Sequence, residues 1–148
     1  MNLRAIGRAC AVLGFLPFCT PALSQAALDL AAGIHRIRAE VANTYGGRAQ
    51  GLMQRTGLAT NGGMLFVFDR PDQHCMWMRN TLIPLSVAFL DEQGRIVNVE
   101  EMLPQTENNH CAAKPAKFAL EMNAGWFKAK GLMAGASIAG IDKAPPAR

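Results

Sequence analysis

Alternation of apolar and polar residues predicts β-strands in two parts of the chain. In residues 34–43, Ile37, Ala39 and Val41 fall on one face while Arg and Glu fall on the other. A period of two is typical of a strand with one buried face. Residues 117–123 alternate in the same way. Both segments are therefore predicted to be half-exposed strands.

Apolar runs without alternation predict further strands in the middle of the chain. Residues 64–69 are continuously apolar up to Asp69, which indicates a strand covered on both faces, and the following Pro71 is expected to end it. Residues 75–81 are predicted to form the next strand. Residues 85–91 and 95–102 flank Glu92-Gln93-Gly94 and are predicted to form a hairpin.

Helices are expected in only two places. Residues 48–55 can form two helical turns, and residues 124–131 can form a short helix that ends at a glycine. The Ala-rich residues 27–33 are predicted to be a loose lead-in, and residues 135–141 a last strand. Six or seven short strands with two short helices predict one mainly β (α+β) domain, compact and sandwich-like or barrel-like.

The first 26 residues have the order of a secretory signal peptide. Arg4 and Arg8 precede an apolar run, and small residues lead up to Ala26, after which we expect cleavage. The apolar run is about a dozen residues, whereas a membrane-spanning helix needs about 20. The sequence therefore predicts a periplasmic or secreted protein with no membrane span after cleavage.

Charge argues against a nucleic-acid partner. Loss of the leader leaves thirteen basic and eleven acidic residues, which are interspersed along the chain. Nucleic-acid-binding domains carry a basic stripe with a strong excess of positive charge, and the sequence shows no such stripe.

Two cysteines, Cys75 and Cys111, remain after the predicted cleavage. Two cysteines in an exported chain predict one disulfide. The bond would close a loop of about 36 residues, and the chain-entropy estimate of its contribution to stability is roughly 4 kcal/mol. Free or redox-active thiols remain an alternative, although the chain has no Cys-x-x-Cys motif.

A metal site is a second interpretation of the same cysteines. His74-Cys75 and His110-Cys111 would supply two nitrogens and two sulfurs, a set that suits tetrahedral zinc. Thioethers nearby in the sequence would suit Cu(I); they belong to Met76, Met78, Met102 and Met122. Two objections apply: neighbouring strand residues point to opposite faces, and oxidising conditions favour the disulfide.

Polar and aromatic residues on two of the predicted strands suggest a ligand groove. On a strand, Trp77, Arg79 and Thr81 share one face, and Glu121 would reach Arg79 if the strands are neighbours. The candidate ligand-binding residues are Trp77, Arg79, Asn80, Thr81, Glu121, Asn123 and Trp126. An apolar site with a few polar groups is typical of ligand pockets. The alternative is a structural ion pair with amides that cap turns.

Catalytic motifs are missing from the sequence. It has no Gly-x-Ser-x-Gly elbow, His-Glu-x-x-His pair or phosphate-binding loop. We therefore assign no catalytic residue. An enzyme with Glu121 or Asp91 as acid or base remains an alternative.

Four short elements resemble one known family. They are Gly51-Leu52-Met53 with Arg55, Gly63-Met64-Leu65-Phe66, Trp77-Met78-Arg79-Asn80-Thr81 with Ile83-Pro84-Leu85, and Leu120-Glu121 followed by Asn123-Ala124-Gly125-Trp126. In this order they resemble the bacterial and archaeal Domain of Unknown Function 192 family. The resemblance covers about 45–141 and implies a compact, mainly β domain.

Two positions depart from the family pattern. Ser86 stands where the family usually has Asp, and Gly135-Ala136 where it usually has Gly-Asp. No catalytic residue is established for the family, so the resemblance supplies none. With it, the chain divides into a signal peptide (1–26), a lead-in with the first strand (27–44), the family-like domain (45–141) and a tail (142–148).

These observations predict a non-enzymatic domain of the cell envelope without a cofactor. It would bind a small envelope ligand or a partner protein, and the Cys75–Cys111 disulfide would stabilise it. Copper or zinc binding by the His-Cys pairs is the first alternative. An envelope enzyme is the second.

Overall fold

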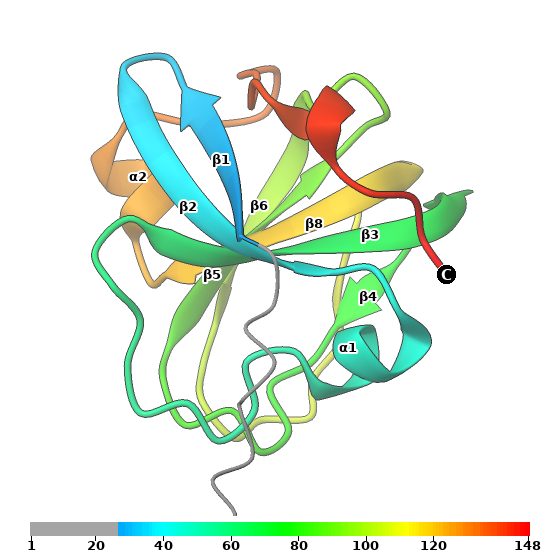
Figure 1. Cartoon of the computed structure of the whole chain (residues 1–148). Helices are drawn as coiled ribbons and strands as arrows, with labels where there is room; N and C mark the ends of the chain where they lie inside the picture. The colour runs from blue at the N-terminus through cyan, green and yellow to red at the C-terminus, as the bar shows by residue number, and fades with distance from the viewer. Residues whose placement is uncertain (1–26) are drawn as a thin grey trace, which may run out of the picture.

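The computed structural model describes residues 27–148 and folds them mainly into β-strands (Figure 1). Six strands form one open sheet with β1 and β6 at its edges, in the order β1-β2-β3-β8-β5-β6. These strands are β1 (Ala27–Ala32), β2 (His35–Ala42), β3 (Gly62–Asp72), β5 (Leu85–Leu90), β6 (Ile96–Met102) and β8 (Ala116–Asn123). The predicted mainly β class is confirmed. The predicted signal peptide lies outside the described residues.

Small elements complete the fold. A two-stranded ribbon pairs β4 (Cys75–Met76) with β7 (His110–Cys111), and the helices are α1 (Tyr45–Gln50), α2 (Trp126–Ala129) and the 3-10 turn η1 (Ile141–Lys143). Over residues 27–148, no helix has the length and apolar character needed to cross a lipid bilayer.

The predicted loose lead-in at residues 27–33 is wrong. The segment forms β1, which pairs antiparallel with β2 through Leu28–Ala39 and Leu30–Ile37. Gly33 adopts a φ of 58° at the turn, a conformation that glycine reaches at no steric cost. The high Ala content concealed an alternating Leu28-x-Leu30 pattern and a glycine turn signal.

Each face of the sheet carries its own hydrophobic core, because successive strand residues point to opposite faces. The first core contains Leu65, Leu120 and Phe127, together with other residues of β1, β2, β5 and the C-terminal segment. The second core contains Phe66 and Met78, with residues of β5 and β8. Neighbours such as Leu65 and Phe66 on β3 are thus buried on different sides.

Residues 135–139 join the two edges of the sheet, and we call them the strap. The Ala139 amide donates to the Ala31 carbonyl on β1 (2.7 Å), while the Ile96 amide of β6 donates to the Ala136 carbonyl (2.8 Å). The strand predicted at residues 135–141 is therefore wrong, since the strap makes only isolated bridges. Its few bonds are divided between two edges, which leaves no continuous ladder.

Two further predicted elements differ from the structure. The helix predicted at residues 48–55 is α1, which begins earlier because the Thr44 hydroxyl caps it by accepting from the Gly47 amide (3.0 Å). It ends before Gly51, whose φ is 48°. β3 continues through Pro71 to Asp72, with a register irregularity after Val67. The β5–β6 hairpin, β2 and α2 are confirmed as predicted. β8 is confirmed as a strand, but its predicted exposed face is wrong, because it lies between β3 and β5 and both of its faces are buried.

The C-terminal residues return to the start of α1. The Arg148 amide donates to the Asn43 carbonyl (2.7 Å), and the Tyr45 amide donates to the Arg148 carbonyl (3.2 Å). The Asn43 side-chain amide also donates to the Pro146 carbonyl (2.8 Å). These bonds place the chain end beside the junction of β2 and α1.

Candidate functional site

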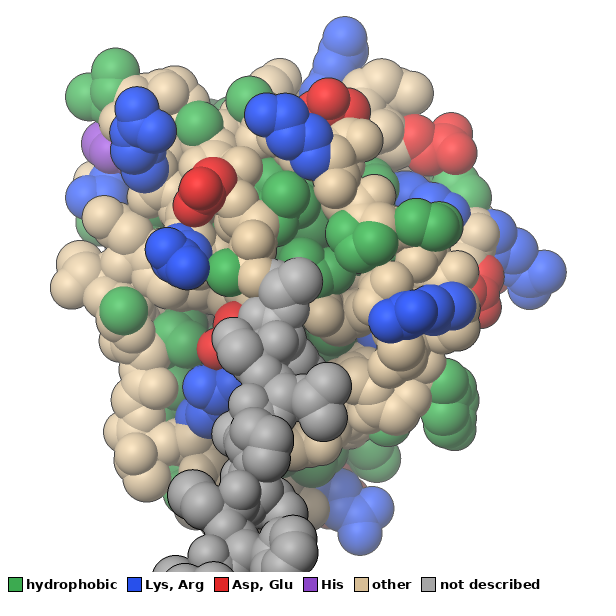
Figure 2. All heavy atoms as spheres, in the orientation of Figure 1, with side chains coloured by type: hydrophobic (Ala, Val, Ile, Leu, Met, Phe, Trp, Pro, Cys, Tyr) green, Lys and Arg blue, Asp and Glu red, His purple; other side chains and the backbone are tan. Residues whose placement is uncertain are grey.

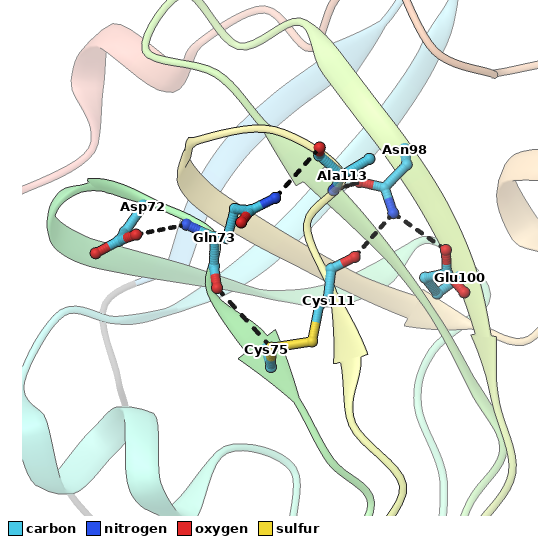
Figure 3. Close-up of a disulfide and its surroundings, with 7 residues drawn as sticks. All are labelled: Asp72, Gln73, Cys75, Asn98, Glu100, Cys111 and Ala113. Atoms are coloured by element: carbon cyan, nitrogen blue, oxygen red, sulfur yellow. Dashed lines mark hydrogen bonds between the residues drawn. A yellow bond between two sulfur atoms is a disulfide. The ribbon is translucent and has the colours of Figure 1, made fainter.

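A disulfide between Cys75 and Cys111 closes the ribbon of β4 and β7, with Cα atoms 4.0 Å apart (Figure 3). The ribbon is attached to β6, because the Asn98 amide donates to the Cys111 carbonyl (3.1 Å) and its oxygen accepts from the Ala113 amide (2.9 Å). The predicted disulfide is thus present, and it fixes the strand that leads directly to Trp77.

The His-Cys pairs are arranged unlike a metal centre. The two sulfurs are bonded to each other, so the thiolates that a soft metal needs are not available while the bond is closed. The His74 ring stacks on Phe68 with centroids 3.7 Å apart. Within residues 27–148, no three His, Cys, Asp or Glu side chains are placed to hold a metal ion together. The methionines proposed as copper ligands are buried: Met76, Met78 and Met102 in the second core and Met122 in the first.

The strand predicted at residues 75–81 is wrong beyond Met76. The Met78 amide donates to the Thr106 carbonyl (3.0 Å), and Asn80 adopts a φ of 57° that no strand tolerates. β4 ends early because its partner β7 has only two residues. We call the connection at residues 77–81 the Trp77 loop.

Neighbouring segments hold the Trp77 loop on both sides. The Gln54 amide donates to the Asn80 carbonyl (2.9 Å), and the Gln105 amide donates to the Thr81 carbonyl (3.0 Å). Trp77 is 46% exposed. The Arg79 guanidinium lies 5.7 Å from the centre of the indole and 3.9 Å from the Glu107 carboxylate. The loop therefore presents a half-exposed indole with a cation over it.

Glu121 is buried in the middle of the sheet. It lies on β8 between Met64 of β3 and Val87 of β5, and only 3% of its surface is exposed. Burial disfavours the charged form of the carboxyl group and raises its pKa to about 8. At neutral pH most molecules therefore carry a protonated Glu121, which can donate one hydrogen bond.

A small cavity connects Glu121 with the Trp77 loop. Its volume is about 20 Å³, which is room for on the order of one water molecule. The apolar walls are Leu52, Met53, Phe66, Met76 and Trp77. The polar side chains are Arg48, Gln50, Thr81 and Glu121.

Arg48 is the only cation among the residues that line this cavity, and its guanidinium is already engaged. Its Nη1 donates to the carbonyls of Asn43 (2.8 Å) and Val67 (3.0 Å), and Nη2 lies 3.8 Å from the Asp69 carboxylate. Within residues 27–148, no hydrogen bond or ion pair reaches the Glu121 carboxyl group. The acid faces the cavity without a protein partner from the described part of the chain.

The structure brings together only some of the predicted ligand residues. Trp77, Thr81 and Glu121 line one cavity, and Arg79 lies over Trp77. The Arg79–Glu121 ion pair expected for neighbouring strands is not formed, because Arg79 lies in the Trp77 loop and faces Glu107. Asn80 contributes its backbone to the Trp77 loop: its φ is positive, and its carbonyl accepts from the Gln54 amide.

Asn123 and Trp126 lie elsewhere. The Asn123 amide donates to the Ala59 carbonyl (2.9 Å), which fixes the loop before β3. Trp126 is buried in the first core, where its indole nitrogen donates to Asn61 (3.1 Å). The prediction of one groove shared by Trp77 and Trp126 is therefore wrong, since the two indoles lie on opposite sides of the sheet.

Several cavity residues were missed from the sequence. Gly51 lies against the Phe66 ring, whose nearest atom would be 3.1 Å from a Cβ at that position. This packing brings Met53 and the end of α1 over β3. The signal in the sequence is the family-like elements Gly51-Leu52-Met53 and Gly63 to Phe66, whose local pattern does not link them to a site.

Ser86, where the family usually has Asp, lies beside a carboxylate from the neighbouring strand. Its hydroxyl donates to Glu101 of β6 (2.7 Å), and the Gly125 amide donates to both the Ser86 oxygen (2.8 Å) and Glu101 (3.1 Å). This group holds the start of α2. Asp91, the other suggested acid or base, accepts from the amides of Gln93 (2.9 Å) and Arg95 (2.8 Å) and stabilises the β5–β6 turn.

The chain matches one family over most of its length. The family is DUF192, described as Uncharacterized ACR, COG1430, and the match covers residues 27–140. No curated protein matches the chain.

Two solved structures share the fold and a third of the sequence. One is a "putative transcription regulator" from Sinorhizobium meliloti 1021, with 34% identity, 80% of this chain and 97% of that chain covered, and a TM-score of 0.76. The other is a protein of unknown function from Novosphingobium aromaticivorans DSM 12444, with 33% identity, 80% and 89% covered, and a TM-score of 0.75.

Proposed function

The chain belongs to the DUF192 family, and we propose that it is a non-enzymatic binding protein that takes a small ligand at the Glu121 cavity. The observation that carries this proposal is a buried carboxyl group that faces a cavity without a partner among the described residues. Polar groups in protein interiors are almost always hydrogen-bonded, to the protein or to water. A ligand or water that supplies this bond is favoured.

The mouth of the cavity supports the same proposal. Trp77 is half exposed at the edge, and the wall combines apolar side chains with polar ones. Ligand sites typically combine apolar walls with a few polar groups that fix orientation. A ligand would insert one group toward Glu121 and leave the rest against the indole.

We further propose that the protein works in the periplasm or outside the cell. Two observations support this: the leader-like pattern of residues 1–26 and the Cys75–Cys111 disulfide, a bond that persists in oxidising compartments. We propose no role in nucleic-acid binding. On the face shown in Figure 2, basic side chains are scattered singly with acidic ones between them, whereas such a role requires a basic patch.

An enzymatic role is the second candidate, and the raised pKa of Glu121 is the observation that favours it. A carboxyl group with a pKa near the working pH suits proton transfer. Among the residues that line the cavity, Arg48 and Thr81 are the other groups able to assist, and Arg48 is held by backbone carbonyls. Binding therefore accounts for the site with fewer assumptions than turnover.

A screen by nuclear magnetic resonance tests the binding proposal. We would label the methionine methyl groups and add small amides, carboxylates and amines in turn. The expected result is a saturable shift of Met53 and Met76, which line the cavity, with no shift of the exposed Met133. Trp77→Ala should weaken binding, while Ile34→Ala, which trims an exposed side chain elsewhere, should not.

Two outcomes of this screen would contradict the binding proposal. If no compound moves Met53 or Met76, the ligand-binding proposal fails. If a compound is consumed by the wild type but not by Glu121→Gln, the enzymatic candidate replaces it.

A further inference from the structure

We propose that the Glu121 cavity selects a small uncharged hydrogen-bond acceptor, such as the carbonyl oxygen of an amide, while the rest of the ligand lies on Trp77. This inference rests on the proposed function because it concerns the same cavity. It adds the chemical class of the ligand group, which three features of the site determine.

The first feature is size. The cavity has a volume of about 20 Å³, which is room for on the order of one water-sized group. A carbonyl oxygen fits this space, whereas a ring does not. The remainder of the ligand must stay at the mouth, where Trp77 offers a half-exposed apolar surface.

The second feature is the state of Glu121. β3 and β5 place Met64 and Val87 on either side of it, so no neighbouring strand supplies a countercharge. A carboxylate removed from water without a countercharge is strongly disfavoured against the neutral acid. Its pKa of about 8 agrees with this reasoning. At neutral pH the group is a hydrogen-bond donor, and a donor requires an acceptor.

The third feature is the charge around the cavity. Arg48 lines the wall and Arg79 covers the indole at 5.7 Å, with Glu107 beyond it. Both arginines repel an entering cation, and Arg79 already occupies one face of Trp77. An anion gains little in return, because backbone carbonyls and Asp69 engage the Arg48 guanidinium. A neutral acceptor avoids the desolvation of a ligand charge.

The experiment compares three probes of similar size: acetamide, acetate and ethylammonium. Each is titrated into the whole protein, and the Met53 and Met76 methyl shifts are followed with Met133 as internal control. Probes this small bind weakly, since even the best small ligands gain at most about 1.5 kcal/mol per non-hydrogen atom. High probe concentrations are therefore used, and acetamide should produce the largest saturable shift.

The pH dependence identifies the donor. Acetamide affinity should fall about 30-fold between pH 6.5 and pH 9.5, because the acid loses its proton through a pKa of about 8. Glu121→Gln keeps an N–H donor of similar shape. It should bind acetamide with little change between the two pH values. Glu121→Leu removes the donor and should lose the shift at both.

The outcomes separate the inference from the proposed function. Tighter binding of ethylammonium or acetate would overturn the ligand class and leave a binding site. An acetamide affinity that does not change with pH in the wild type would overturn the role of Glu121 as donor. If none of the three probes moves Met53 or Met76 while the wider screen finds a ligand, the inference is wrong; if the screen also finds none, the proposed function is wrong.

Discussion

At the scale of single residues, Glu121 is the least expected feature of the sheet. The residues beside it on the same face, Met64 of β3 and Val87 of β5, are buried and apolar, and an apolar side chain would be compatible with the same environment. A carboxyl group here lowers stability whenever it ionises, so its presence calls for a function. The alternation on β8 could be read from sequence. The burial of Glu121 could not be predicted from sequence, because it depends on the register of three strands and on the position of α1.

Glu121 should make stability fall as pH rises. Its pKa is about 8 in the folded protein against 4.5 for the free group, so the folded state holds the proton more tightly. The contribution of Glu121 to the free energy of unfolding is therefore largest below about pH 4.5 and decreases up to about pH 8, by up to about 5 kcal/mol. Urea unfolding at pH 5, 7 and 9 measures it.

Glu121→Gln should remove most of that slope. It should resemble the wild type at pH 5 and exceed its stability at pH 9. Glu107→Gln, at an exposed position, is the control and should keep the wild-type slope. A wild-type stability that does not decrease between pH 5 and pH 9 would contradict the prediction.

At Gly63, the close approach of the neighbouring strand β8 leaves no space for a side chain. A Cβ at this position would lie 2.6 Å from the Glu121 carbonyl oxygen, closer than real Cβ atoms come. We expect Gly63→Ala to lower the free energy of unfolding by about 1–3 kcal/mol, as overpacking of a tight core does. Gly46→Ala is the control: nothing lies within 4 Å of its Cβ in α1. It should raise stability by about 0.5–1 kcal/mol, and equal effects of the two changes in urea unfolding would contradict this account.

At the scale of elements, the sequence predicted those parts that carry their own pattern. β2, β8 and the β5–β6 hairpin alternate or flank a turn, and each formed as expected. The strands predicted at the Trp77 loop and at the strap were wrong, because partners far along the chain decide the conformation of these two segments. β7 is too short to extend β4, and the strap divides its bonds between two edges. The candidate site was half predicted for the same reason: local pattern identified Trp77 and Glu121, but only the fold shows that α1 covers them.

The disulfide should control the order of the Trp77 loop as well as stability. The ribbon has two residues in each strand, so the covalent bond and Asn98 are its main supports. Replacing both cysteines, Cys75→Ser with Cys111→Ser, should lower the free energy of unfolding by about 2–4 kcal/mol. It should also increase the rate of hydrogen exchange at the Met78 amide, which donates to the Thr106 carbonyl just beyond the ribbon.

Amide hydrogen exchange on the far side of the sheet provides the control for that experiment. The Ala139 amide of the strap contacts β1 and not the ribbon, so its exchange should change only through global stability. Equal changes at Met78 and Ala139, measured under conditions where local opening dominates, would show that the disulfide stabilises the whole domain and not the loop in particular.

At the scale of the whole molecule, the two cores have different roles. The first core is closed by the strap and α2, with Trp126 buried in it, and serves stability. The second core is covered by α1, the ribbon and the Trp77 loop, which are short and separately attached elements. The one buried carboxylic acid of the described chain lies on this side.

The proposed location is tested by the mass of the protein made with its leader in a bacterial host. Protein from the periplasm should begin at Ala27 and be lighter by the two hydrogen atoms lost in forming one disulfide. After denaturation it should take up no alkylating reagent unless it is first reduced. As a control, Cys111→Ser should leave Cys75 free to react once the protein is unfolded. Recovery of the full-length chain from the cytoplasm with two reactive thiols would contradict both the export and the oxidised ribbon, and with them the proposal that the Glu121 cavity meets its ligand outside the cytoplasm.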